Sequence, residues 1–489
     1  MAGSIRVNRR QSLAILGLAG TVLAAACGSQ PAAPTSAPAS APTPVPAAPT
    51  TAAAAKSGTS GASAAPTVAK PAGQSAAANP TPAAAAAPAK APVEVVLVQR
   101  NIPQDVKFFQ GLGTKFTQQN PSISVKIETM SSDFAQTLQA RLAAGTAGDM
   151  ARNATHNTLV GQALLGLFKP VDAFVKADGY DLKQHFDTAI NAATVKGQLI
   201  CLPWNCHPGW SAIYYLKGLF DQAQVSYPTG DWTYDDWHVA AAKLTKSQNG
   251  RPFQYGMWLS TSFEAVLTIV TADGGTFQNL DGTKPTYTDP KTIAGFQYQV
   301  DAYQKWKTSP ANPSFDSRVS LWTSNRVATV LSGIWENAYL GDVTPKGETM
   351  DVAPGPKGSS GQLGGYFGCN VYPIWNTSKH PQEAWQLQKY LATKEVGILD
   401  YEAGVEPGAR PDVWDDPKVA GDPKVKPHAA AIKIVKPMPV PANGRLGELR
   451  VEVQKVMDLV WAGEKSVPQG AAEMQTAAEK IMAEPPPGA

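Results

Sequence analysis

The chain has 489 residues, with 42 Lys or Arg and 39 Asp or Glu, so its formal net charge is +3. This balance argues against a nucleic-acid-binding surface, which needs a clear excess of positive charge. About 400 residues follow residue 93, which is enough for two packed lobes and too many for one ordinary core.

Residues 1–26 have the pattern of an export signal. Arg6, Arg9 and Arg10 form a basic start, and the apolar segment from Leu13 to Ala26 is too short and too rich in alanine for a stable membrane span. The Arg9–Arg10 pair resembles a twin-arginine export signal. Alternatively, the pair supplies only the positive charge that any secretory signal carries.

A lipid attachment site is predicted at Cys27. The segment Leu23–Gly28 resembles a lipobox, in which small residues precede a cysteine that is lipidated and becomes the mature N-terminus. The alternative is an ordinary cleavage site with an incidental cysteine. Residues 27–92 are mostly Ala, Pro, Thr, Ser and Gly, which cannot bury enough apolar surface to offset chain entropy. We therefore expect an exported protein held by a lipid and a disordered tether at the outer face of the cytoplasmic membrane, at the cell surface or in the periplasm.

The first folded segment has the pattern of a parallel α/β lobe. Val93–Val98 is a continuous apolar run, typical of a strand that is buried on both faces. A helical pattern from Val106 to Phe116, an alternating strand from Ile123 to Ile127 and a second helix that ends at Gly145 follow it. This strand–helix order favours a doubly wound sheet.

The stretch Gln198–Thr245 organises the middle of the chain. A β-prone run at Leu199–Leu202 is predicted to stop at Pro203, and a second strand is predicted at Ser211–Tyr215. A short amphipathic helix follows, and Thr233 is placed to cap the next one. Further on, the patterns predict a strand at 253–258, helices at 263–272 and from 290, and two final helices at 447–461 and 469–482.

Taken together, these motifs resemble the bacterial extracellular solute-binding proteins, the sugar-binding, maltose-binding-protein-like family of ABC importers. The matching positions are Gly197, Leu202–Trp204, Tyr214–Lys217, Leu219–Phe220, Pro228, Trp232, Asp235–Trp237, Gly333–Trp335, Gly364–Asn370, Ser378–Trp385 and Glu406–Arg410. The resemblance implies an α/β two-lobe periplasmic-binding-protein fold with discontinuous lobes and a hinge. The first lobe would comprise residues 93–203 and 370–405, the second residues 206–368 and 410–482, and residues 483–489 would form a tail.

The resemblance also implies a ligand site between the lobes. Tryptophans cover the apolar faces of sugars while polar groups read the hydroxyls, although any one tryptophan can equally be part of the core. The expected ligand-binding residues are Trp204, Asn205, His207, Trp258, Trp322, Trp335, Glu336, Asn370, Arg410, Arg100, His156 and Asn157.

No catalytic signature accompanies these residues. The chain contains no Gly–Lys pair, no His-Glu-x-x-His and no Gly-x-Ser-x-Gly motif. We therefore expect a monomeric receptor without cofactor that captures a sugar or oligosaccharide and delivers it to separately encoded permease subunits. The alternatives are a surface-anchored enzyme that acts on polysaccharide, and a binding partner of a sensor.

Cys201, Cys206 and Cys369 leave three possibilities open. With His207 they could bind zinc, because thiolates and imidazoles suit that metal. Otherwise they are buried apolar thiols, or one disulfide with a spare thiol. We expect no metal.

Overall fold

The computed structural model describes residues 91–101, 103–130, 134–311 and 315–487. The export signal, Cys27 and nearly all of the tether predicted for 27–92 lie outside the described residues. Within the described ranges, no helix is both long enough and apolar enough to cross a bilayer.

A parallel sheet in the order β2–β1–β3 forms the centre of the first lobe. Its middle strand β1 (Val93–Arg100) pairs along its whole length with β2 (Ile123–Met130) and more briefly with β3 (Met150–Ala151). β1 is covered on both faces, as the apolar run predicted: Val95 and Leu97 are buried on one face and Val98 on the other. The predicted strand–helix–strand–helix order is confirmed, and both strands extend a few residues beyond the predicted ends.

The other helices and short strands of this lobe pack around that sheet or lie near it. They are α1 (Pro103–Gln119), α2 (Phe134–Ala143), α3 (Leu159–Leu164), α4 (Asp172–Asp178), η2 (Leu182–Gln184), α5 (Asp187–Ala192), β5 (Thr194–Val195), β6 (Gln198–Leu199), α12 (Pro381–Leu391), α13 (Lys394–Glu402), α14 (Pro411–Trp414) and α15 (Pro417–Ala420). The helix α16 (Lys426–Ala431) lies instead against β12 (Met350–Pro354) of the second lobe.

Two antiparallel strands carry the chain between the lobes. β7 (Pro203–His207) pairs with β13 (Gly368–Val371), which also pairs with β4 (Asn153–Ala154). The prediction that the strand stops at Pro203 was wrong, because β7 begins there. Proline is tolerated at the first position of a strand, where its missing N–H breaks no ladder bond, and the ladder register shifts beside Pro203.

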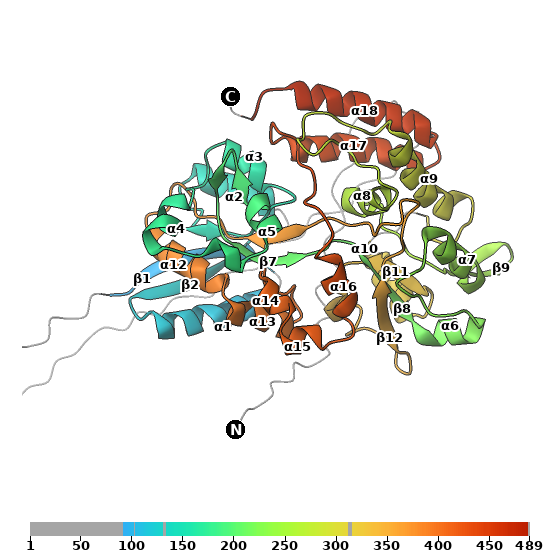
Figure 1. Cartoon of the computed structure of the whole chain (residues 1–489), viewed down its shortest axis with the longest axis horizontal. Helices are drawn as coiled ribbons and strands as arrows, with labels where there is room; N and C mark the ends of the chain where they lie inside the picture. Colours follow the sequence, from blue (N-terminus) through green and yellow to red (C-terminus); the bar gives the residue numbers. More distant parts are fainter. Residues whose placement is uncertain (1–90, 102, 131–133, 312–314, 488–489) are drawn as a thin grey trace, which may run out of the picture. The chain divides into compact units, whose positions relative to one another are not determined.

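The second lobe is built on an antiparallel sheet in the order β11–β8–β12. Its central strand β8 (Ala212–Leu216) is buried throughout, between β11 (Thr329–Ser332) and β12 (Met350–Pro354). The surrounding elements are α6 (Lys217–Ala223), α7 (Tyr234–Leu244), β9 (Lys246–Gln248), β10 (Arg251–Gln254), α8 (Phe263–Ala272), α9 (Pro290–Gln304), α10 (Phe315–Thr323), α11 (Glu336–Tyr339), α17 (Leu446–Trp461) and α18 (Val467–Ala483). Figure 1 shows α17 and α18 paired beside α9.

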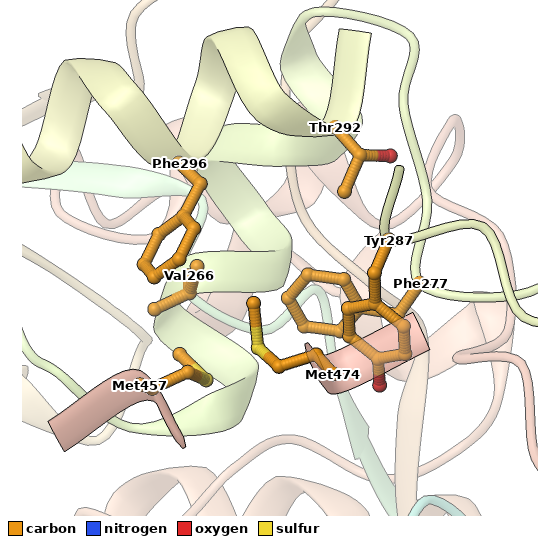
Figure 2. A pocket seen from close by; sticks show the side chains of 7 residues that line it. All are labelled: Val266, Phe277, Tyr287, Thr292, Phe296, Met457 and Met474. Atoms are coloured by element: carbon orange, nitrogen blue, oxygen red, sulfur yellow. The ribbon is translucent and has the colours of Figure 1, made fainter. Parts of the chain in front are cut away.

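The interior of the second lobe is closely packed where four helices converge. Side chains from α8, α9, α17 and α18 meet there, as Figure 2 shows. The gap that they surround has no room for a water molecule. It is lined by Val266, Phe277, Tyr287, Thr292, Phe296, Met457 and Met474. Methionines from two different helices fill this gap, because their flexible side chains adapt to irregular spaces. The gap is therefore part of the hydrophobic core and no ligand site.

Two separate hydrophobic cores confirm that the lobes are discontinuous. The first core contains side chains from 95–206 and 367–432 together with Ile334, whereas the second contains the other core side chains from 212–366 and those from 438–481. The chain thus passes between the cores near residues 207–212, 366–367 and 432–438. Residues 410–432, which the sequence analysis assigned to the second lobe, contribute Val413, Trp414 and Val419 to the first core.

Candidate functional site

The ladder between β7 and β13 brings together residues that are far apart in the sequence. Asn205 lies directly opposite Asn370, and the Asn370 side-chain amide donates a hydrogen bond to Asn205 Oδ1 at 2.8 Å. The Asn205 amide in turn points to Glu406 Oε2, 3.4 Å away. Both asparagines are buried at the hinge. Three of their polar groups are therefore already used to hold the two crossing strands and the loop of Glu406 together.

Two histidines meet above Gly368. The ring centres of His156 and His207 are 5.3 Å apart, and a β-carbon on Gly368 would lie 2.6 Å from His207 Cε1 and 2.8 Å from His156 Nδ1. Only glycine leaves space for both rings. The Gly209 N–H donates to His207 Nδ1 at 3.2 Å. Nδ1 is thus the acceptor, which leaves the proton of the neutral ring on Nε2.

Burial keeps both imidazoles neutral. Desolvation lowers the pKa of His207, with the nearby Glu406 carboxylate opposing it. Desolvation also lowers the pKa of His156 well below its ordinary value, and His207 and Arg450 add to this effect. A neutral imidazole has one donor and one acceptor, and because Gly209 occupies the His207 acceptor, His207 offers a donor at Nε2. Neutral groups of this kind are suited to hydroxyls.

A row of aromatic side chains leads from the histidines into the second lobe. His207 lies 5.4 Å from Trp335, Trp335 lies 5.9 Å from Trp210, and Trp210 stacks on Trp258 at 6.4 Å, measured between ring centres. Trp335 and Trp210 are partly exposed, whereas Trp258 is buried. Tyr366 lies beside both histidines, at 5.3 Å and 5.8 Å. The row thus presents two accessible indoles next to a neutral hydrogen-bonding pair.

A buried ion pair supports this row from behind. Arg318 Nη1 lies 2.5 Å from Glu336 Oε1, and both side chains are fully buried. The same carboxylate oxygen accepts hydrogen bonds from Ser332 Oγ at 2.8 Å and from Trp335 Nε1 at 3.1 Å. The guanidinium also lies over the Trp258 ring, 5.5 Å from its centre. Burial raises the pKa of Glu336, and pairing with Arg318 opposes that shift. Glu336 therefore fixes the orientation of Trp335.

Two charged residues at the first-lobe side of the site, Asp105 and Arg152, were not predicted from the sequence, whereas their neighbour Arg100 was. Asp105, in the first turn of α1, lies 3.4 Å from Arg100 and 3.5 Å from Arg152. The Arg152 guanidinium lies 5.9 Å from the centre of the Trp204 ring. Burial raises the pKa of Asp105, Arg100 opposes this shift, and Glu406 adds to it. Arg152 directly follows the parallel strand β3. Its position was a signal for a site residue, because ligands bind at the carboxyl ends of parallel strands.

Tyr339 brings the second lobe close to this charged group. It lies on α11 and is 47% exposed. Burial of its hydroxyl raises its pKa, and the charges of Asp105, Arg100 and Glu406 act on it. These interactions join a residue of α11 to residues that follow β1 and α13. Charges of the first lobe thus act on a tyrosine of the second lobe.

Two predicted site residues, Trp322 and Arg410, lie apart from this cluster, and a third, Asn157, is not among the contacts that define it. Trp322 is fully buried in the second core, where its Nε1–H donates to Thr344 Oγ1 at 3.3 Å. Arg410 is held by Gln184 and by two hydrogen bonds to Asp412, at 2.9 Å and 2.7 Å. The side chain of Asn157 is exposed. The structure brings together the other nine predicted residues around the hinge and the aromatic row.

The three described cysteines are free and buried. Cys206 and Cys369 lie opposite each other in the β7–β13 ladder, and no disulfide joins them. Desolvation raises the pKa of all three thiols. Among the described residues, no group of three or more His, Cys, Asp or Glu side chains is arranged to hold a metal ion.

Comparison with known proteins identifies the family. Residues 101–398 match the family model described as bacterial extracellular solute-binding protein. The chain belongs to this family. A protein of Brucella abortus that is named as a binding protein is 23% identical to this solute-binding protein over 295 residues, which are 59% of this chain and 69% of the relative.

Solved structures share the fold of this solute-binding protein. The ABC substrate-binding protein from Listeria monocytogenes, in complex with cycloalternan, superposes with a TM-score of 0.71 at 19% identity, over 80% of this chain and 99% of that chain. The maltose/maltodextrin-binding domain from Bdellovibrio bacteriovorus, bound to maltotriose, gives a TM-score of 0.68 at 19% identity, over 80% and 100%. The predicted two-lobe fold with a hinge is confirmed. Membership of an extracellular family also implies that the chain is exported.

Proposed function

We propose that this solute-binding protein binds a sugar or an oligosaccharide between its two lobes. The observation that carries the proposal is the row of partly exposed indoles, Trp335 and Trp210, beside the neutral imidazoles of His156 and His207. Indole faces cover the C–H surfaces of a sugar ring, and neutral donors and acceptors match its hydroxyls without requiring a charge. Saccharides bound to neighbours of the same fold support this ligand class.

The charged group of the first lobe fits a neutral polyhydroxyl ligand. Asp105 lies between Arg100 and Arg152 at distances longer than a good charge-assisted hydrogen bond, which leaves polar atoms for hydroxyls of a ligand. The two acids, Asp105 and Glu406, balance the two arginines. We infer that these four residues read the hydroxyl pattern, while Asn205 and Asn370 hold the hinge strands that position Glu406.

The proposed role is delivery of the sugar to an ABC importer. Ligand contacts on both lobes favour the closed arrangement, which the permease subunits would recognise. We further propose that the protein acts as a monomer held at the membrane by a lipid on Cys27.

A thermal-shift screen tests this function. The protein is heated with a panel of mono- and oligosaccharides that includes maltotriose, and with peptides and polyamines as controls. A ligand that binds only the folded state raises the melting temperature by mass action, by an amount set by its concentration relative to Kd. A rise with one group of saccharides supports the proposal and defines the ligand. A rise with a peptide or polyamine alone contradicts it.

A further inference from the structure

The two lobes touch backbone to backbone at a pair of glycines. Gly161 lies in α3 of the first lobe, and Gly444 lies in the loop before α17 of the second (Figure 1). A β-carbon on Gly161 would lie 2.6 Å from the carbonyl oxygen of Gly444, and one on Gly444 would lie 2.9 Å from the Gly161 Cα. Ordinary contacts of a β-carbon lie between 3.4 and 4 Å. Neither position therefore has room for even a methyl group in this arrangement.

Both sides of this contact are anchored in their own lobes. Leu159 fixes the start of α3 in the first core. On the other side, the Asn443 amide donates to the carbonyls of Ile481 and Glu484 at 2.8 Å and 3.0 Å, and Leu446 is buried in the second core. A clash at the glycines would therefore be relieved mainly by moving one lobe against the other.

The contact adjoins the candidate site through both chain segments that form it. His156 lies in the turn that leads into α3, and Arg450 lies on α17, close enough for its charge to act on His156. A second close approach occurs where Gly404, after α13, meets α11: a β-carbon on Gly404 would lie 3.0 Å from the β-carbon of Ala338. The lobes thus approach each other closely at two places beside the site.

We propose that Gly161 and Gly444 form a closure contact that sets the spacing between the two halves of the ligand site. This inference rests on the proposed function for its effect on ligand affinity. The two glycines act as positioning residues, because they touch no ligand themselves. A side chain at either position holds the lobes apart, so that a ligand seated on one lobe loses part of its contact with the other.

The variant Gly161→Ala tests the effect on affinity, with maltotriose as the probe. We expect at least a tenfold weaker affinity, seen as faster dissociation of the ligand. The ligand-free protein should keep its unfolding midpoint, because alanine has a higher helix propensity than glycine. Gly447→Ala is the matched control, since Gly447 also lies in a helix and a β-carbon there meets no atom within 4 Å. Equal affinities of the two variants would overturn the inference.

A crosslinking experiment tests the contact without any ligand. In the full chain carrying Cys27→Ser, Gly161→Cys and Gly444→Cys are combined and treated with a short bis-maleimide. The control pair combines Gly161→Cys with Gly447→Cys. The two cysteine side chains push the glycines slightly apart, and the reagent spans that small separation. We therefore expect much faster crosslinking of the first pair, and the buried native thiols stay unreactive in both. Equal rates for both pairs would overturn the contact itself. If no saccharide binds the wild type, the proposed function fails, and the crosslinking rates alone decide the contact.

Discussion

At the scale of single residues, one carboxylate organises the aromatic part of the site. Glu336 Oε1 receives the Arg318 guanidinium, the Ser332 hydroxyl and the Trp335 indole N–H. These interactions are shielded from solvent, because both charged side chains are fully buried. Replacing either partner of this pair leaves the other charge buried without a counter-charge, which strongly destabilises the fold.

Glu336→Gln should strongly destabilise the protein. The amide can still accept from Trp335 but no longer balances Arg318, so we expect a loss of roughly 3 kcal/mol in the free energy of unfolding. Urea denaturation measures it. The control is Glu452→Gln, which breaks the exposed pair with Lys455 and should cost less than about 0.5 kcal/mol. Similar losses in both variants would refute the structural role of Glu336.

Trp335→Ala should weaken saccharide binding without preventing folding. The ring is partly exposed, and its removal takes away one stacking face, so we expect about a tenfold rise in Kd, equivalent to about 1.4 kcal/mol. Fluorescence titration with the ligand found by thermal shift measures the change. Trp306→Ala removes another partly exposed tryptophan of the second lobe, one that contacts His238 and Tyr298 instead, and should leave Kd unchanged.

At the scale of secondary-structure elements, the helix-capping signal was reliable, whereas the strand predicted at 253–258 was misplaced, because β10 covers Arg251–Gln254. Thr233 caps α7 as predicted: its hydroxyl accepts from the Asp236 N–H at 3.1 Å, and Asp236 accepts from the Thr233 N–H at 2.9 Å. This reciprocal arrangement satisfies two N–H groups that the first turn of a helix leaves free. It is independent of the ligand site.

Thr233→Ala should therefore reduce stability by about 1 kcal/mol and leave ligand affinity unchanged. Thermal denaturation measures the loss. Thr476→Ala provides the comparison, because Thr476 lies exposed inside α18, where its hydroxyl only bonds back to the Ala472 carbonyl. That variant should stay within about 0.5 kcal/mol of the wild type. An effect of Thr233→Ala no larger than this would contradict the capping role.

The strands and helices could largely be predicted because their signals are local. The helix at Phe263–Ala272 and the helix that starts at Pro290 have the predicted positions. The site could be predicted only in part. Asn205 meets Asn370 through a ladder register that no local pattern specifies. The sequence also does not distinguish Trp335, which is partly exposed, from Trp322, which is buried in the core. Asp105 was missed because its role depends on the partners that the fold brings to it.

At the scale of the whole molecule, buried histidines should make the fold sensitive to acid. Burial lowers the pKa of His185 to about 4 and that of His428 to about 3. His428 shares a hydrogen bond of 2.8 Å with the Tyr214 hydroxyl. The folded state therefore takes up protons at a lower pH than the unfolded chain, whose histidines titrate near pH 6.5.

Stability should fall as the pH drops from about 6.5 to 4. Below the unfolded pKa the unfolded chain binds protons that the folded protein does not, which favours unfolding, by roughly 3 kcal/mol for His185 at the lower end. Urea denaturation at pH 8, 6.5, 5 and 4 measures this slope. His185→Gln should flatten the curve between pH 6.5 and 4. An unchanged curve would show that His185 does not contribute to the acid sensitivity.

The buried thiols have a practical consequence. Cys201, Cys206 and Cys369 are inaccessible, and their raised pKa values keep them protonated at neutral pH. A thiol-reactive dye added to the folded protein should therefore not react with these three cysteines and should label only a cysteine introduced at the surface. With Cys27 replaced, a dye placed on the exposed face of α11 would sit where the lobes approach one another. The protein then becomes a fluorescent sensor, whose emission reports its own ligand in solution.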